Sequence, residues 1–277
     1  MIRLSLLAVL TMVAFASNSL LNRVALAEGL ISPDAFAAIR LTSGALALGI
    51  MVSLSQKNLG WLGKGTAVGA IALAVYAIGF SFAYLRIDAG LGALLLFGVV
   101  QITMFTAALI HQQESISPQR WIGTGIAFAG LILLLLPGAA APSLPFVALM
   151  MVSALGWGFY TLAGKQATDP LASTAANFLY AAPAGLVVWA LVPTPGPMTG
   201  AGVGLALISG IVTSGMGYAL WYFILPKLRT TTAALAQLTV PIIAAVGGVI
   251  LLGEGMTLVF VLSASLVLFG VGLSLRR

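Results

Sequence analysis

Ten long apolar stretches, separated by short polar segments, account for most of the 277 residues of the chain. The pattern predicts membrane-spanning helices over residues 3–27, 34–55, 65–86, 90–112, 118–136, 145–165, 171–192, 201–225, 230–252 and 257–275. A helix needs about 20 apolar residues to cross a bilayer, so these spans leave room only for short turns. The fold class is therefore predicted to be all-α integral membrane, without a soluble catalytic or nucleic-acid-binding domain.

Proline marks several boundaries of these spans. Three spans are predicted to begin at a proline that follows a capping residue, in the pairs Ser32–Pro33, Ser117–Pro118 and Asp169–Pro170. Pro183 and Pro241 fall inside spans, where the missing backbone donor should kink the helix.

The positive charges predict the orientation of the spans. With the N-terminus inside, nine of the 12 Lys and Arg residues fall on the cytoplasmic side, namely Arg3, Lys57, Lys64, Arg120, Lys165, Lys227, Arg229, Arg276 and Arg277. Arg23, Arg40 and Arg86 fall toward the outside. Short cytoplasmic loops retain Lys and Arg, so both termini are predicted to be cytoplasmic. The net charge of +6 is interpreted as topology and not as nucleic-acid binding.

An internal repeat relates the two halves of the chain. A shift of 140 residues places Glu114 on Glu254, Gly130 on Gly270, Ala93 on Ala233 and Ile102 on Ile242. The predicted halves are residues 1–137 and 144–277, joined by a short external linker at 138–143. Because five spans is an odd number, the halves must have opposite orientation, which is the pattern of inverted-repeat transporters.

The motifs resemble those of a known family. They are residues 84–93 (YLRIDAGLGA), 114–123 (ESISPQRWIG), Arg40 in AAIRL, residues 231–241 (TTAALAQLTVP) and the pair Gly253–Glu254. They resemble the EamA-type family of the drug/metabolite transporter superfamily, and the chain is most similar there to bacterial aromatic amino acid exporters. The resemblance implies two inverted five-helix halves and export of small metabolites across a bacterial inner membrane. Gln101 stands where many members have proline, whereas Pro241 retains it in the ninth span.

Deep aromatic residues are the first candidates for substrate binding. Tyr76, Phe80, Trp157 and Tyr160 offer ring faces for stacking and for an ammonium group. Packing is the alternative interpretation. For Trp61, Tyr84, Trp121, Trp221 and Tyr222, near span ends, packing or an interfacial belt is favoured.

Amide side chains are the second set of candidates. Asn18 lies on a polar stripe of the first span, and Gln101 and Gln237 lie in the fourth and ninth spans. An amide both donates and accepts hydrogen bonds, so these residues suit a zwitterionic substrate. Interhelical hydrogen bonding that holds the bundle together is the alternative.

Candidate hinges come from the small residues. Gly79, Gly98, Gly215, Gly217 and Gly247, with Pro241, are interpreted as possible hinges, and close helix packing is the alternative. Arg40 is predicted to snorkel or to pair with Asp34 or Asp88, in preference to binding a substrate carboxylate.

The acidic residues bear on the mechanism. All six map to span ends or loops, so no carboxylate lies at midplane to couple transport to protons. The prediction is facilitated export of neutral, aromatic amino acids by alternating access. Other metabolites or lipophilic drugs are the alternative substrates. One His, no Cys and no paired deep acids argue against an intramembrane enzyme, a metal site or a cofactor. A small-molecule substrate and the bilayer are the expected partners, and the fused halves predict a monomer.

Overall fold

The computed structural model describes residues 2–110, 118–135, 143–228 and 236–274. All regular elements in these ranges are helical. The spans are α1 (Ile2–Ala27), α2 (Pro33–Gln56), α3 (Ala67–Ala83), α4 (Ala89–Ile110), α5 (Pro118–Leu135), α6 (Leu144–Gly164), α7 (Pro170–Leu191), the composite α8–η2–α9, α11 (Thr239–Leu252) and α12 (Leu258–Ser274). A short 3-10 helix, η1 (Gly60–Lys64), precedes α3. The described residues thus contain ten helical stretches in the predicted order, and five of them are long and apolar enough to cross a membrane.

Two spans depart from a plain α-helix. The eighth consists of α8 (Gly200–Ile208), the π-helical segment η2 (Ser209–Met216), α9 (Gly217–Ile224) and the 3-10 turn η3 (Leu225–Lys227). The ninth is interrupted at Leu238, and α11 begins at Thr239. Pro241 cannot donate to the carbonyl four residues earlier, so it breaks this span as predicted and lies in the first turn of α11. Pro183 lies inside α7.

The prolines at helix starts are confirmed where the chain is described. Asp169 caps α7, because its carboxylate accepts from the Ala172 N–H at 3.1 Å. Ser32 is the N-cap of α2 but makes no side-chain capping bond. The Ser117–Pro118 cap lies outside the described residues, since Ser117 is not among them.

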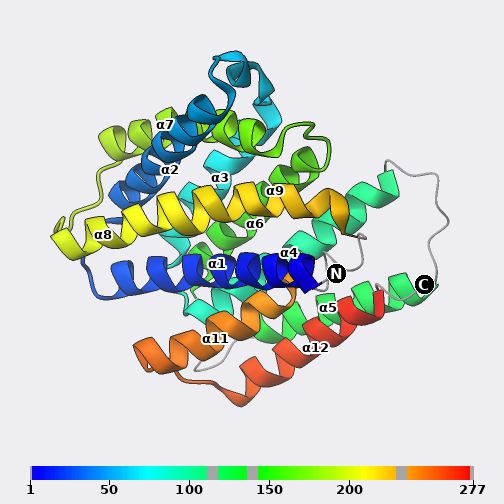
Figure 1. Ribbon diagram of the computed structural model, residues 1–277. Coiled ribbons are helices and arrows are strands. Elements are labelled where there is room, and N and C mark those ends of the chain that lie inside the picture. The colour runs from blue at the N-terminus through cyan, green and yellow to red at the C-terminus, as the bar shows by residue number, and fades with distance from the viewer. Residues whose placement is uncertain (1, 111–117, 136–142, 229–235, 275–277) are drawn as a thin grey trace.

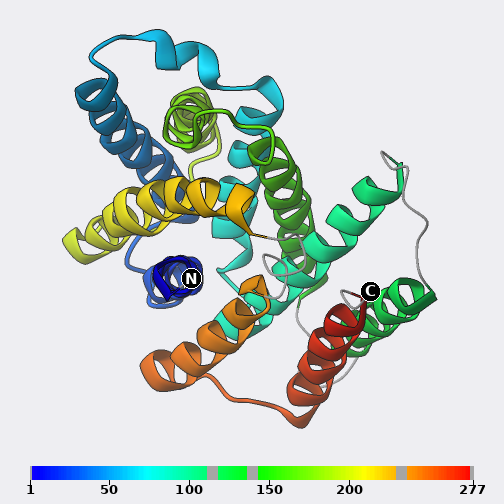
Figure 2. The same cartoon turned by 45° about the vertical axis from the view of Figure 1, so that its right-hand side comes forward.

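The helices pack in a regular set of pairs (Figures 1 and 2). α1 lies along α8–η2–α9, α2 along α7, α3 along α6, α4 along both α6 and α11, and α5 along α12. Figure 2 shows α5 and α12 side by side at one edge of the bundle. The start of α1 and the end of α12 lie at the same end, on the right of Figure 1.

Glycines set the distance between α5 and α12. A Cβ on Gly130 would stand 3.0 Å from the Ser263 carbonyl oxygen and 3.0 Å from the Val267 side chain. In the opposite direction, Gly270 faces the backbone of Gly123 and Ala127. The two glycines that the repeat aligned therefore both lie at close contacts between these helices.

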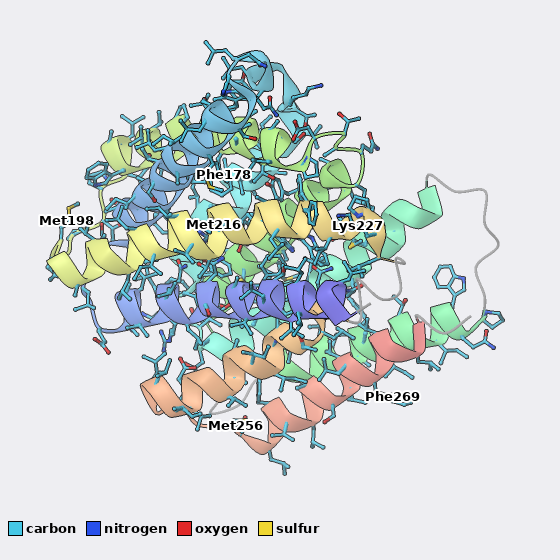
Figure 3. The ribbon with its side chains drawn as sticks, in the orientation of Figure 1. Phe178, Met198, Met216, Lys227, Met256 and Phe269 are labelled. Atoms are coloured by element: carbon cyan, nitrogen blue, oxygen red, sulfur yellow. The ribbon has the colours of Figure 1, made fainter. Side chains whose placement is uncertain are left out.

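The outer surface of the bundle is apolar. Leu54, Leu191, Ile250 and Leu258 are each more than 70% exposed, and Phe269 on α12 is 64% exposed (Figure 3). Five described helical stretches are long and apolar enough to cross a membrane, and five more apolar helices are shorter. Such a continuous apolar surface is unfavourable in contact with water, so the chain is a multi-pass membrane protein. The polar chemistry must lie in the core.

Candidate functional site

Six buried aromatic side chains meet in the centre of the bundle. This core aromatic cluster comprises Phe15, Tyr76, Phe80, Trp157, Tyr160 and Tyr218, each at most 5% exposed. Neighbouring ring centroids lie 4.7–6.2 Å apart. The rings come from α1, α3, α6 and α9, so helices far apart in the sequence assemble the cluster.

Arg40 lies beside this cluster and is only 1% exposed. Its Nε donates to Ser214 Oγ at 2.8 Å, and its Nη2 donates to the Tyr218 and Tyr76 hydroxyls at 2.7 and 3.1 Å. The guanidinium carbon stands 5.1 Å from the centroids of both Tyr76 and Phe80, which is within cation–π range. Nη1 is buried and makes no hydrogen bond within the described part of the chain.

The expected pairing of Arg40 with Asp34 or Asp88 is wrong. Asp88 pairs with Arg23, and Asp34 accepts from the Thr194 N–H at 3.3 Å. Nor does Arg40 snorkel, because its side chain lies in the core. A charged group at the centre of a membrane helix costs about 2.5–3.5 kcal/mol even on the mildest scales. Among the described residues, hydroxyls and ring faces are all that offset this cost.

Asn18 connects α1 to the π-helical segment. Its Oδ1 accepts from Ser209, Thr213 and Ser214 of η2, and its Nδ2 lies 3.4 Å from the Tyr218 hydroxyl. Because Ser214 also accepts from Arg40, Asn18 holds the hydroxyl that orients the guanidinium. π-helical turns are often found at functional sites, and here one places these hydroxyls on a single face.

Close backbone contact brings η2 and α2 together. A Cβ on Gly44 of α2 would stand 2.9 Å from the Gly210 carbonyl oxygen and 2.6 Å from the ring of Phe178. Phe178 of α7, labelled in Figure 3, is 1% exposed and packs 5.9 Å from the Tyr218 ring. A larger residue at Gly44 would displace η2 and with it the groups around Arg40.

The two glutamines differ in their surroundings. Gln237 is fully buried, and its Oε1 accepts a long bond of 3.5 Å from the Trp157 indole N–H. Gln101 is partly exposed and makes no described contact with the core aromatic cluster. The Nε2 of each is buried without a partner in the described ranges. Asn18, Tyr76, Phe80, Trp157, Tyr160 and Gln237 are therefore brought together, and Gln101 is not.

Aromatic residues near span ends mostly pack inside the bundle. Trp61, Tyr84, Trp221 and Tyr222 are at most 5% exposed, so these four are packing residues and not part of an interfacial belt. Trp121 is 57% exposed and has the position expected of a belt residue.

The candidate hinge glycines occupy tight helix contacts. A Cβ on Gly79, Gly98, Gly215, Gly217 or Gly247 would meet a neighbouring atom at 3.2 Å or less. Close packing explains these glycines, and nothing in the contacts distinguishes a hinge. The break at Leu238, three residues before Pro241, is a different local feature, because there the helix itself is interrupted.

An ion-pair cluster joins the two halves at the end of the bundle that holds the C-terminus of α1. Arg23 Nε donates to Glu254 Oε1 at 2.8 Å, and Arg23 Nη2 donates to Asp88 Oδ1 at 3.0 Å. Glu254 Oε2 also accepts from the Ala89 N–H at 2.8 Å. Burial raises the pKa of the Glu254 carboxyl, and the bonds from Arg23 and Ala89 offset part of that rise.

Sequence reasoning missed several residues of the site. Phe15, Ser214 and Tyr218 were not among the candidates, and Arg40 was assigned to a different role. Ser214 and Tyr218 lie four residues apart, so they share a helix face. That spacing was the available signal, although it does not reveal that Arg40 lies opposite.

The site offers donors and ring faces. In the described part of the chain, no group of three or more His, Cys, Asp or Glu residues is placed to hold a metal ion. Arg40 and the tyrosine hydroxyls supply the donors, and the core aromatic cluster supplies the ring faces.

Comparison with known proteins places the chain in a family. The profile of the EamA-like transporter family matches residues 144–276. An uncharacterized protein of Pseudomonas aeruginosa is 46% identical over 252 residues, which cover 91% of this chain and 87% of that protein. An uncharacterized transporter of Archaeoglobus fulgidus is 28% identical over 261 residues, covering 89% of this chain and 90% of that one.

One solved crystal structure has the same fold. It matches with a TM-score of 0.70 and 16% identity, over 98% of this chain and 96% of that one. The family profile on the second half, the relatives over nearly the full length and the apolar helical bundle agree, and the chain belongs to the EamA-like transporter family, membrane transporters of the drug/metabolite superfamily.

Proposed function

We propose that this chain exports neutral amino acids, aromatic ones in particular, across a bacterial inner membrane by alternating access. The observation that carries the proposal is the core aromatic cluster. Tyr76 and Phe80 come from the first half of the chain, and Trp157, Tyr160 and Tyr218 come from the second. A site built from two halves can open to either side when the halves rock against each other.

The helix pairing supports two inverted repeats, residues 1–137 and 144–277. A two-fold axis between the halves requires reciprocal pairing: if the first helix of one half packs against the third helix of the other half, the reverse contact must also exist. α1 lies against α8–η2–α9, and α3 lies against α6. The contacts α2–α7, α4–α11 and α5–α12 each join a helix to its own counterpart and are compatible with the same axis.

The glycine contacts between α5 and α12 give a second argument for that symmetry. Gly130 faces Ser263 and Val267, whereas Gly270 faces Gly123 and Ala127. Gly123 and Ala127 precede Ser263 and Val267 by the same 140 positions that separate the two glycines. Reciprocal contacts of this kind are expected when a two-fold axis relates the halves.

The ion-pair cluster of Arg23, Asp88 and Glu254 is proposed to close the external end. The charge pattern favours a cytoplasmic position for both termini, and the C-terminal end of α1 would then be external. Opening toward the outside requires these bonds to break, because they join α1 and the start of α4 to the loop that precedes α12.

Transport is proposed to be facilitated. The described carboxylates lie at helix ends or in loops, and none contacts the core aromatic cluster. Proton-coupled transporters commonly use a deep carboxylate that binds either proton or substrate. An imposed pH gradient should therefore not concentrate the substrate in liposomes. The fused halves support a monomer as the working unit.

Equilibration of radiolabelled amino acids into liposomes that hold the purified protein, with no ion gradient, tests the function. We expect saturable entry of Trp, Phe or Tyr and slower entry of aliphatic amino acids. Trp157→Ala should weaken entry, and Trp189→Ala should not, because Trp189 is 40% exposed on α7. If a lipophilic drug enters and no amino acid does, the proposal is wrong and the drug-exporter alternative holds.

A further inference from the structure

We infer that Arg40 binds a carboxylate group of the transported molecule, so that the substrates are carboxylic acids with an apolar body. The aromatic nature of that body rests on the proposed function, whereas the carboxylate rests on Arg40 itself. The inference moves the polar end of the substrate from the amides of Asn18, Gln101 and Gln237 to a guanidinium.

The first argument is charge. Arg40 is fully buried and belongs to no ion pair in the ranges that the structure describes. The other charged residue buried in those ranges is Asp34, at the start of α2, whose carboxylate accepts from the Thr194 N–H in the loop between α7 and α8. A guanidinium in a protein stays protonated. A positive charge in a low-dielectric core is therefore left for an anion to neutralise.

The second argument is a surplus of hydrogen-bond donors. The Tyr218 hydroxyl accepts from Arg40 and donates to the Tyr76 hydroxyl at 2.9 Å. The Tyr76 hydroxyl thus accepts two bonds, and its own hydrogen has no acceptor in the described structure. Arg40 Nη1 has two further hydrogens without an acceptor. An ionised carboxylate is acceptor-only and matches the planar guanidinium fork.

The third argument is the position of the rings. Tyr76 and Phe80 both lie 5.1 Å from the guanidinium carbon, and Tyr76 lies 4.9 Å from Trp157. A carboxylate bound at Arg40 would leave the rest of the molecule beside these rings. The same Tyr76 side chain therefore serves the polar end with its hydroxyl and the apolar body with its ring.

The amides fit this assignment in other roles. Asn18 Oδ1 already accepts from three hydroxyls, so Asn18 is a positioning residue that fixes Ser214 against Arg40. Within the described ranges, Gln237 Nε2 has no hydrogen-bond partner, and Gln237 Oε1 accepts only a long bond from Trp157. The substrate ammonium has few acceptors near Arg40, so its contribution to binding should be the smaller one.

A ligand series on the unmodified protein tests the inference without any variant. L-phenylalanine, 3-phenylpropionate and phenethylamine carry the same ring with both charged groups, the carboxylate alone and the ammonium alone. Each competes with radiolabelled L-phenylalanine for the purified full-length chain in detergent. We expect 3-phenylpropionate to compete within about tenfold of L-phenylalanine and phenethylamine to be at least about 100-fold weaker, since a buried charge loses its partner.

Two variants locate the effect at Arg40. Arg40→Lys keeps the positive charge but loses the planar guanidinium that can make two parallel hydrogen bonds. This variant should still prefer 3-phenylpropionate to phenethylamine, at lower affinity. Arg40→Gln should abolish the preference. A melting curve of each variant shows whether it folds, and the unmodified protein decides the question if neither does.

The outcomes separate this inference from the proposed function. Phenethylamine binding as well as 3-phenylpropionate would overturn the role of Arg40 while leaving an aromatic site intact. If no aromatic compound binds, 4-methylpentanoate and isopentylamine are compared directly by the thermal shift of the protein. Stabilisation by the acid alone supports Arg40 and refutes aromatic export, and stabilisation by the amine or by neither compound refutes the inference.

Discussion

Breaking the Arg23–Glu254 pair should open the proposed external end of the transporter. Arg23→Gln removes the charge that bonds Glu254 at 2.8 Å and Asp88 at 3.0 Å. The side chains of Arg23 and Glu254 are 16% and 11% exposed, whereas that of Asp88 is 50% exposed. The Asp88 pair should thus contribute little, about 0–1 kcal/mol. The mostly buried charged bond to Glu254 should contribute about 2 kcal/mol.

That free energy sets the size of the expected shift. If the pair exists only while the external end is closed, its loss favours the open state by about 2 kcal/mol, which is roughly 30-fold in the equilibrium. Glu254→Gln should have a smaller effect, because burial raises the pKa of the Glu254 carboxyl and already offsets part of what its charge contributes. The largest effect is expected for Arg23→Gln, since that change also removes the bond to the Tyr84 carbonyl at 3.2 Å.

A single engineered thiol measures this opening. The chain has no cysteine, so Ser19→Cys introduces the only one. Ser19 is 2% exposed and lies one turn from Arg23 on the same face of α1, on the inner side of the ion pair. A membrane-impermeant maleimide added from outside should label it about 10- to 30-fold faster when Arg23→Gln is also present.

Arg86→Gln is the matched control. Arg86 is an exposed arginine at the same end of the bundle, and neither ion pair in the described ranges involves it. Equal labelling rates in the Arg23 and Arg86 variants would refute the reasoning. Faster labelling from the cytoplasmic side alone would show that the assigned orientation is wrong.

Three further predictions concern the pH dependence of stability, the packing of α5 against α12, and the core aromatic cluster. The pKa of Glu254 in the folded protein is raised above its ordinary value of 4.5. Between pH 4.5 and that raised pKa, the folded protein therefore binds a proton at Glu254 that the unfolded chain has released. The melting temperature of the unmodified protein should then fall relative to Glu254→Gln as pH rises through that window, and an unchanged difference would contradict the shift. In Gly270→Ala the added methyl group would meet the backbone of α5, so the protein should be destabilised by about 1–3 kcal/mol. In Gly272→Ala the methyl group would meet open space, so this control should be neutral or stabilising, and thermal melts compare the two variants. Trp157→Phe keeps a ring and loses only a 3.5 Å bond, so competition binding should show less than about a tenfold loss of affinity for L-phenylalanine.

The spans were predictable because each depends on local composition. A run of about 20 apolar residues forms a helix in lipid, since no water satisfies the backbone there. Boundaries agree with the prediction to within a few residues for most spans, as for 34–55 against Pro33–Gln56. The π-helical segment η2 was not foreseen, because its backbone depends on how α1 and α2 pack against it.

The site was predictable in part. Tyr76, Phe80, Trp157 and Tyr160 were singled out by their depth in the spans, and the structure brings them together. Depth alone did not find Phe15 or Tyr218, because spacing along one helix does not say which helix lies opposite. The same limit affected Trp61 and Tyr222, which lie near span ends but are buried by neighbouring helices.

The sequence by itself determined the helices, their order and the 140-residue repeat that aligns Gly130 with Gly270. These features depend on hydrophobicity and period, which are properties of neighbouring residues. Only the tertiary structure decided which partner each charge would take. Arg23 meets Glu254, 231 positions away, and Arg40 meets Tyr218, 178 positions away. Such contacts depend on the packing of distant helices, and no local pattern encodes them.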